Sequence, residues 1–142
     1  MTARSVTPNM LVEDVAQTVR YYIETLGFSY VMGVSGAQEL HLEYDAQVPL
    51  SFAIVASGTV QLMFQQIERF REEVDPQATL QEGATPVVLY IEIDAVDSYY
   101  RKIASKVEVL TEPRNTFYGM REFYIRDCNG TILTFAQKLG VA

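Results

Sequence analysis

Apolar and polar residues alternate in several short runs of this chain, whereas two longer stretches place apolar residues three or four positions apart. Alternation is typical of a half-buried β-strand, and the longer spacing is typical of an amphipathic helix. The first half of the sequence therefore predicts a strand over residues 5–12 and a helix over 14–25. Residues 37–50 give no clear pattern. Three extended segments complete this half, the last two as a hairpin around Ala56-Ser57-Gly58: residues 28–34, 51–55 and 60–65.

The second half of the sequence predicts the same order of elements. Residues 66–86 are mostly polar and predict a linker that contains a short helix. Asn129-Gly130 favours a tight hairpin turn because both residues tolerate positive φ. The elements predicted after the linker are a strand at 87–93, a helix at 96–105, a strand at 107–110 and a hairpin at 121–126 and 131–137.

The sequence also repeats itself. Val12-Glu13-Asp14-Val15 returns 81 positions later as Ile93-Asp94-Ala95-Val96, and in both copies an acidic residue separates an extended run from a helix. Such self-similarity indicates two copies of one structural unit. We therefore predict an α+β fold of two tandem βαβββ modules, whose strands form a cupped mixed sheet around a cleft. Residues 1–142 would form a single domain, with modules at about 5–65 and 87–138 and the linker at about 66–86.

Successive strand residues point to opposite faces of a sheet, so alternation separates helix-packing residues from cleft-lining residues. In the first strand of each module, the predicted cleft-lining residues are Thr7, Asn9, Leu11, Val88, Tyr90 and Glu92. Five aromatic residues are predicted to lie in the core: Tyr22, Phe28, Tyr99, Phe123 and Phe135.

Composition and charge argue against some classes of binding partner. A content of 49% hydrophobic and 20% charged residues is typical of a globular protein. The formal charge of -7 opposes phosphate backbones and anionic lipids, so we expect no nucleic acid or membrane partner. The sequence has neither a signal peptide pattern nor a membrane-spanning run, which predicts a cytoplasmic protein. The single cysteine, Cys128, cannot form an internal disulfide.

Three motifs are Leu11-Val12-Glu13-Asp14-Val15, Leu26-Gly27-Phe28, and Tyr118-Gly119-Met120-Arg121-Glu122-Phe123 leading into Arg126-Asp127-Cys128-Asn129-Gly130. Together they resemble the vicinal oxygen chelate superfamily, which includes glyoxalase I, extradiol dioxygenases and the bleomycin-resistance proteins. The last motif resembles the antibiotic-binding branch in particular. The sequence departs from the family at Cys128, where proline is usual, and at Asn129, where aspartate is frequent.

Metal-dependent members of this superfamily carry His or Glu at four cleft-facing positions, because a divalent ion needs converging nitrogen or carboxylate ligands. The resemblance places these positions on Thr7, Gln61, Val88 and Thr134. None of the four is a usual metal ligand, and His41 is the only histidine. A site rebuilt from His41, Glu39 or Glu43 is the less favoured alternative. The resemblance therefore implies a protein with no metal, no cofactor and no catalytic residue.

The bleomycin-resistance proteins bind a drug in aromatic-lined grooves at a homodimer interface without transforming it. The resemblance thus implies a homodimer that sequesters a partly aromatic small molecule. Glu92 either meets a cationic group of that ligand or is a solvated strand end, and Pro8 fits either an exchanged first strand or an ordinary edge strand. The alternative function is an enzyme of the superfamily, a glyoxalase-like lyase or isomerase or a dioxygenase, with a non-standard site.

Face and loop position select the residues predicted to contact the ligand. Tyr118 takes the place of the family's groove aromatic, which is usually tryptophan. Arg121 and Glu122 either line the groove or form a structural ion pair, and we favour the ion pair. The predicted ligand contacts are Thr7, Asn9, Phe52, Gln61, Met63, Val88, Tyr90, Glu92, Phe117, Tyr118 and Thr134.

Overall fold

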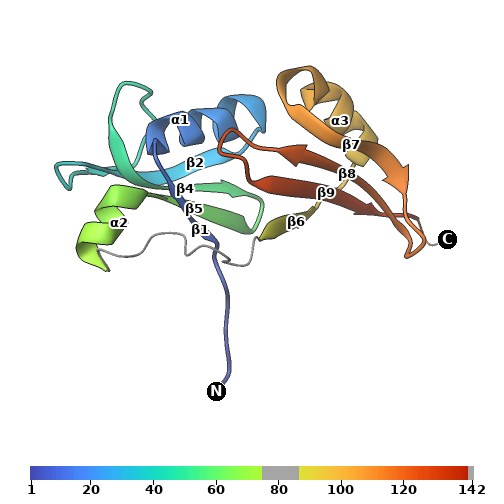
Figure 1. The fold of residues 1–142 in the computed structure, drawn as a ribbon, viewed down its shortest axis with the longest axis horizontal. Helices are drawn as coiled ribbons and strands as arrows, with labels where there is room; N and C mark the ends of the chain where they lie inside the picture. The colour runs from blue at the N-terminus through green and yellow to red at the C-terminus, as the bar shows by residue number, and fades with distance from the viewer. Residues whose placement is uncertain (75–86, 141–142) are drawn as a thin grey trace. The chain divides into compact units, whose positions relative to one another are not determined.

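The structure, a computed structural model, describes residues 1–74 and 87–140. The chain forms two compact units, Met1–Ala84 and Thr85–Ala142, which we call unit 1 and unit 2, each with its own sheet (Figure 1). Residues 75–86, which make up most of the predicted linker, lie outside the described residues.

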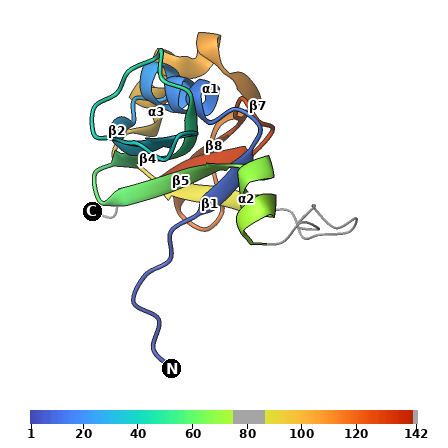
Figure 2. The same cartoon turned by 90° about the vertical axis from the view of Figure 1, so that its left-hand side faces the viewer.

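Unit 1 holds a mixed sheet in the order β1-β5-β4-β2-β3, in which β1 runs parallel to β5 and the other pairs are antiparallel. The helix α2 contacts β1 and β5 (Figure 2). The strands are β1 (Asn9–Val12), β2 (Ser29–Ser35), β3 (Leu40–His41), β4 (Leu50–Ser57) and β5 (Val60–Gln66), and the helices are α1 (Val15–Arg20), its π-helical continuation (Tyr21–Thr25) and α2 (Ile67–Glu73).

The helix α1 packs against the sheet of unit 1, and the core of the unit lies between them. It begins at Asp14, whose Oδ1 accepts a hydrogen bond from the backbone N–H of Gln17 at 3.0 Å. After the π-helical turn the chain leaves through Gly27, whose φ of +85° is strained for residues with a side chain. The buried ring of Tyr22 lies 4.8 Å from that of Phe64 on β5, measured between centroids, and so joins helix to sheet.

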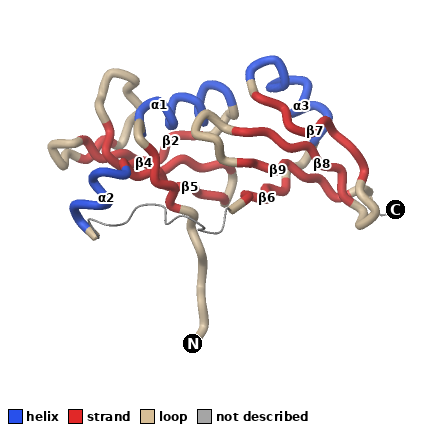
Figure 3. Tube along the Cα trace, viewed as in Figure 1, coloured by secondary structure: helices blue, strands red, loops and turns tan. Residues whose placement is uncertain are grey.

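Unit 2 holds a sheet in the order β6-β9-β8-β7, in which β6 runs parallel to β9. The helix α3 covers one face of this sheet, as α1 does in unit 1 (Figure 3). The buried rings of Phe123 and Phe135 stack at 5.3 Å on that face. The elements are β6 (Val88–Glu92), α3 (Val96–Ile103), a 3₁₀ turn (Ala104–Lys106), β7 (Glu108–Asn115), β8 (Met120–Arg126) and β9 (Ile132–Lys138).

The structure confirms the predicted α+β fold of two βαβββ modules and the predicted short helix after β5. Two strand boundaries differ by more than two residues from those predicted. β1 begins at Asn9 rather than residue 5, since Pro8 has no N–H to donate, although its carbonyl accepts from Met63 N–H at 2.9 Å. β7 runs past residue 110 because Pro113 lies on an edge strand, where a missing N–H is tolerated.

The predicted aromatic core is also present. Phe28 is 6% exposed, and three of the other four rings are at most 1% exposed, namely those of Tyr22, Phe123 and Phe135. Tyr99 packs its ring 5.0 Å from Phe135. Within the part of the chain that the structure describes, no helix is both long and apolar enough to cross a membrane.

Candidate functional site

The open face of the unit 2 sheet, opposite α3, gathers several residues that the sequence predicts to bind a ligand. Strand register aligns Tyr90, Thr134 and Tyr124 across β6, β9 and β8. The next row on this face aligns Glu92, Ala136 and Glu122. Residues in one row of a sheet point to the same side, so the tyrosines and Glu122 share one surface.

Three tyrosine hydroxyls converge on Glu122, which is 0% exposed. Tyr90 donates to Oε2 at 2.5 Å, while Tyr118 and Tyr124 donate to Oε1 at 2.7 and 3.2 Å. We call these four residues the tyrosine–glutamate cluster. They come from β6, from β8 and from the turn before β8, so the cluster joins segments that are distant in the sequence.

The turn between β7 and β8 brings Tyr118 back over its own strand. Thr116 N–H donates to the carbonyl of Met120 at 2.7 Å, which closes the turn. Gly119 has a φ of +83°, a backbone conformation that favours glycine. The turn leaves the ring of Tyr118 half exposed and directs its hydroxyl inwards to Glu122.

The cluster fixes the protonation of its members. Burial alone would raise the pKa of Glu122, but the hydrogen bonds from Tyr90, Tyr118 and Tyr124 and the charge of Arg114 together lower it below its ordinary value. Burial and then the hydrogen bond to Glu122 raise the pKa of Tyr90. The hydrogen bond to Glu122 comes first among the causes that raise the pKa of Tyr118. Tyr90 and Tyr118 therefore remain protonated donors beside an ionised carboxylate.

This arrangement is suited to binding rather than proton transfer. A general base needs a pKa near the working pH and access to the substrate, and Glu122 has neither. Tyr90 and Tyr118 are each 52% exposed, so their rings offer flat apolar surfaces held in fixed positions. Because both rings are hydrogen-bonded to an anion, they also attract a cationic group.

The ionisation of Glu122 gives a testable pH dependence. Because its folded-state pKa lies below the ordinary value of 4.5, Glu122 stabilises the fold above that pH, and this contribution is lost as the pH falls through the folded-state pKa. We expect the stability difference between wild type and Glu122→Gln to be constant near neutral pH and to shrink below pH 4.5. Urea unfolding from pH 7 to about pH 3 measures it. A difference that stays constant down to about pH 3 would show that Glu122 does not titrate as described.

Four other predicted contacts in unit 2 surround or support the cluster. Val88 is 48% exposed on the open face, and Phe117 is fully exposed beside Tyr118, with ring centroids 5.1 Å apart. Glu92 forms an exposed ion pair with Lys138 at 3.7 Å. Thr134 is 1% exposed, and its Oγ1 is buried without a hydrogen-bond partner.

Four of the five remaining predicted contacts lie on one face of the unit 1 sheet, opposite α1. Register pairs Asn9 with Met63, and Nδ2 of Asn9 donates to Oε1 of Gln65 at 3.0 Å. Phe52 pairs with Gln65, and Gln61 lies two residues before Met63 on the same face. Thr7 precedes β1 and is half-buried.

Strand register shows which residue of the first module corresponds to Thr134 in the second. Asn9 pairs with Met63 just as Tyr90, its counterpart in the repeat, pairs with Thr134. Met63, rather than Gln61, is therefore the structural counterpart of Thr134. Gln61 and Met63 are two residues apart, so their side chains lie on the same face of β5.

The favoured ion pair between Arg121 and Glu122 was wrong. Consecutive strand residues point to opposite faces. Arg121 lies on the helix side, where its Nε contacts Oδ1 of Asp97 at 2.8 Å and Nη1 donates to Asn115 at 2.9 Å. Glu122 lies on the open face, in line with the less favoured alternative, and neither it nor Tyr124 was among the predicted ligand contacts. Their two-residue spacing in β8, which matches that of Tyr90 and Glu92 in β6, was the signal that could have found them.

The residues at the family's metal positions do not fit a divalent ion. Val88 has no donor atom, and the hydroxyl of Thr134 is buried. In the described ranges, 1–74 and 87–140, no group of three or more His, Cys, Asp or Glu side chains is placed to hold a metal.

The sequence matches the Glyoxalase/Bleomycin resistance protein/Dioxygenase superfamily over residues 5–135. The chain belongs to this superfamily. No curated protein matches the sequence.

Solved structures show the same fold at low sequence identity. A protein of unknown function from Agrobacterium tumefaciens has a TM-score of 0.70 and 21% identity, covering 98% of this chain and 97% of that one. The bleomycin-binding protein of Streptomyces verticillus, complexed with copper(II)-bleomycin, has a TM-score of 0.59 and 21% identity, with 99% of each chain covered. A glyoxalase-related enzyme from Fulvimarina pelagi has a TM-score of 0.69 and 14% identity, covering 96% and 89%.

Proposed function

We propose that this chain is a metal-independent binding protein of the bleomycin-resistance type, which sequesters a partly aromatic small molecule in the cytoplasm. The tyrosine–glutamate cluster carries the proposal, because it holds two half-exposed rings rigidly around a buried carboxylate. Rigid aromatic surfaces give large contact area at little cost in side-chain entropy. The fold is shared with a bleomycin-binding protein, which supports a ligand of this kind.

The proposed ligand contacts keep the set predicted from the sequence, with unit 2 contributing the aromatic surface. A planar ring of the ligand would stack on Tyr90 or Tyr118, and Phe117 would add apolar area. The ionised Glu122 behind the rings favours a ligand that carries a positive charge. In unit 1, the proposed contacts are Thr7, Asn9, Phe52, Gln61 and Met63.

Calorimetric titration of the full chain with metal-free bleomycin, copper(II)-bleomycin and mitomycin C tests the proposal. We expect saturable binding of at least one of these compounds and protection of cells that express the protein. Absence of both, for all three compounds, would contradict the resistance role.

Replacing Tyr118 by alanine is expected to weaken binding by about tenfold or more, because the stacking surface is lost. The matched variant Tyr118→Phe keeps the ring and loses only the hydroxyl, so its affinity should stay within about threefold of wild type. Titration of both variants with the compound that binds wild type measures the effect. Equal losses in the two variants would assign binding to the hydroxyl instead of the ring.

We further propose that the protein acts as a homodimer, in line with the resemblance to the bleomycin-resistance proteins. Sedimentation at micromolar concentration tests this, and a monomer at all concentrations would contradict it. The alternative function, a superfamily enzyme with a non-standard site, would be favoured by stoichiometric Ni, Zn, Fe or Mn in the purified protein.

A further inference from the structure

Unit 1 contains a pocket of about 380 Å³ between α2 and the sheet face opposite α1. This volume is at the lower end of the range for small-molecule sites. Only one of its residues, Phe52, was predicted to contact a ligand. The lining residues are Val34, Gln38, Ser51, Phe52, Gln65, Arg69 and Glu73.

The floor of the pocket has an apolar part and a polar part. Register places Val34, Phe52 and Gln65 side by side across β2, β4 and β5. Val34 and Phe52 supply an apolar surface. The amide Oε1 of Gln65 accepts from Asn9, which leaves its Nε2 to donate to a ligand.

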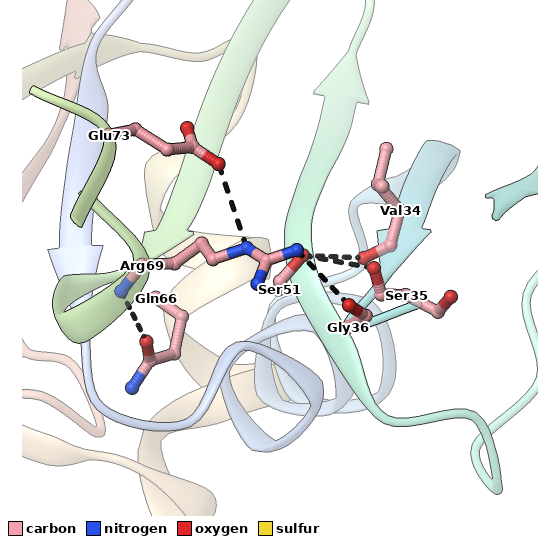
Figure 4. Close-up of polar contacts among 7 residues, drawn as sticks. All are labelled: Val34, Ser35, Gly36, Ser51, Gln66, Arg69 and Glu73. Atoms are coloured by element: carbon pink, nitrogen blue, oxygen red, sulfur yellow. Dashed lines mark hydrogen bonds and ion pairs between the residues drawn. The ribbon is translucent and has the colours of Figure 1, made fainter. Parts of the chain in front are cut away.

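The wall of the pocket comes from α2. Arg69 and Glu73 are four residues apart, so they lie on the same side of the helix, with Nε of Arg69 3.6 Å from Oε1 of Glu73. The guanidinium also donates to the carbonyl of Gly36 at 3.1 Å, and the backbone N–H of Arg69 donates to Gln66 (Figure 4). Since a guanidinium has five N–H donors, these contacts leave donors for a ligand.

Charge restricts what this pocket can accept. Arg69 in the wall opposes a cation. Glu73 opposes an anion, and so does unit 1 as a whole, which has eleven acidic residues against four arginines. A neutral group that both donates and accepts hydrogen bonds satisfies both side chains at once.

We propose that this pocket binds a neutral aromatic carboxamide. Its ring lies against Phe52 and Val34, its carbonyl accepts from Arg69, and its amide N–H donates to Glu73. This site lies within unit 1 and does not depend on the tyrosine–glutamate cluster.

Amide-resolved NMR titration of the full chain with benzamide tests the proposal, with benzoate and benzamidine as the anionic and cationic analogues. We expect benzamide to bind with a Kd of about 1 mM, as suits a fragment of this size. The largest shifts should fall on Ser51, Phe52 and Gln65. Both charged analogues should bind at least about tenfold more weakly.

Variants of α2 distinguish a loss of benzamide recognition from a loss of helix packing. Arg69→Met should abolish benzamide binding, whereas Arg71→Met, which removes an arginine that pairs with Glu68 on the same helix, should leave it unchanged. Glu73→Gln should raise the affinity for benzoate relative to benzamide, a gain that misfolding cannot produce. The proposal is overturned if benzoate or benzamidine binds wild type as well as benzamide does, if shifts fall mainly in unit 2, or if Glu73→Gln leaves the preference unchanged.

Discussion

Replacing Glu122 by alanine is expected to lower the free energy of unfolding by about 3 kcal/mol. The truncation removes the common acceptor of three tyrosine hydroxyls and leaves a cavity in a residue position that is 0% exposed. The cost stays below the sum of three charge-assisted hydrogen bonds because the half-exposed Tyr90 and Tyr118 can turn their hydroxyls to water.

The matched control is Glu92→Ala, in the same row of the same sheet face. Glu92 is exposed and pairs with the exposed Lys138, so its loss should cost less than about 0.5 kcal/mol. Urea unfolding of both variants at pH 7 measures the difference. Similar values for the two glutamates would show that the cluster contributes nothing to stability.

Replacing Phe123 by alanine is expected to cost about 4 kcal/mol, because the ring is fully buried and its removal opens a cavity. Its ring lies 5.3 Å from Phe135, 5.2 Å from Tyr100 and 6.2 Å from Tyr99, so three aromatic contacts are lost together. Such a loss is a large share of the stability of a typical domain.

Phe117→Ala serves as the control for the same chemical change. Phe117 is 100% exposed, so the substitution should alter stability by less than about 0.5 kcal/mol. Thermal or urea unfolding compares the two variants. If Phe117→Ala were as costly as Phe123→Ala, Phe117 would have to be buried in solution, for example against another subunit.

Much of the fold was predictable because it depends on local patterns. Alternation in the β5, β6 and β8 segments and helical spacing around Val15 and Val19 indicated the order of elements. The repeat of an acidic residue between strand and helix indicated the duplication. The core positions of Phe123 and Phe135 followed from the face of the strand alone.

The site was less predictable because its contacts join distant segments. Tyr90 and Glu122 are 32 residues apart, and only the register of β6 on β9 and of β9 on β8 brings them together. The hydroxyl of Tyr118 reaches Glu122 because the chain turns at Gly119. The role of Arg69 depends on where α2 docks against β1 and β5, which no local pattern in a polar segment specifies.

The bond from Tyr90 to Glu122 also affects how the sheet of unit 2 is assembled. β6 is an edge strand whose only strand partner in this sheet, within the described residues, is β9. A slip of two residues would keep its apolar pattern in phase but would carry the Tyr90 hydroxyl roughly 7 Å along the strand, out of reach of the carboxylate. The buried glutamate thus acts as a register lock for the edge strand, and it selects one alignment among those that hydrophobic burial alone would accept.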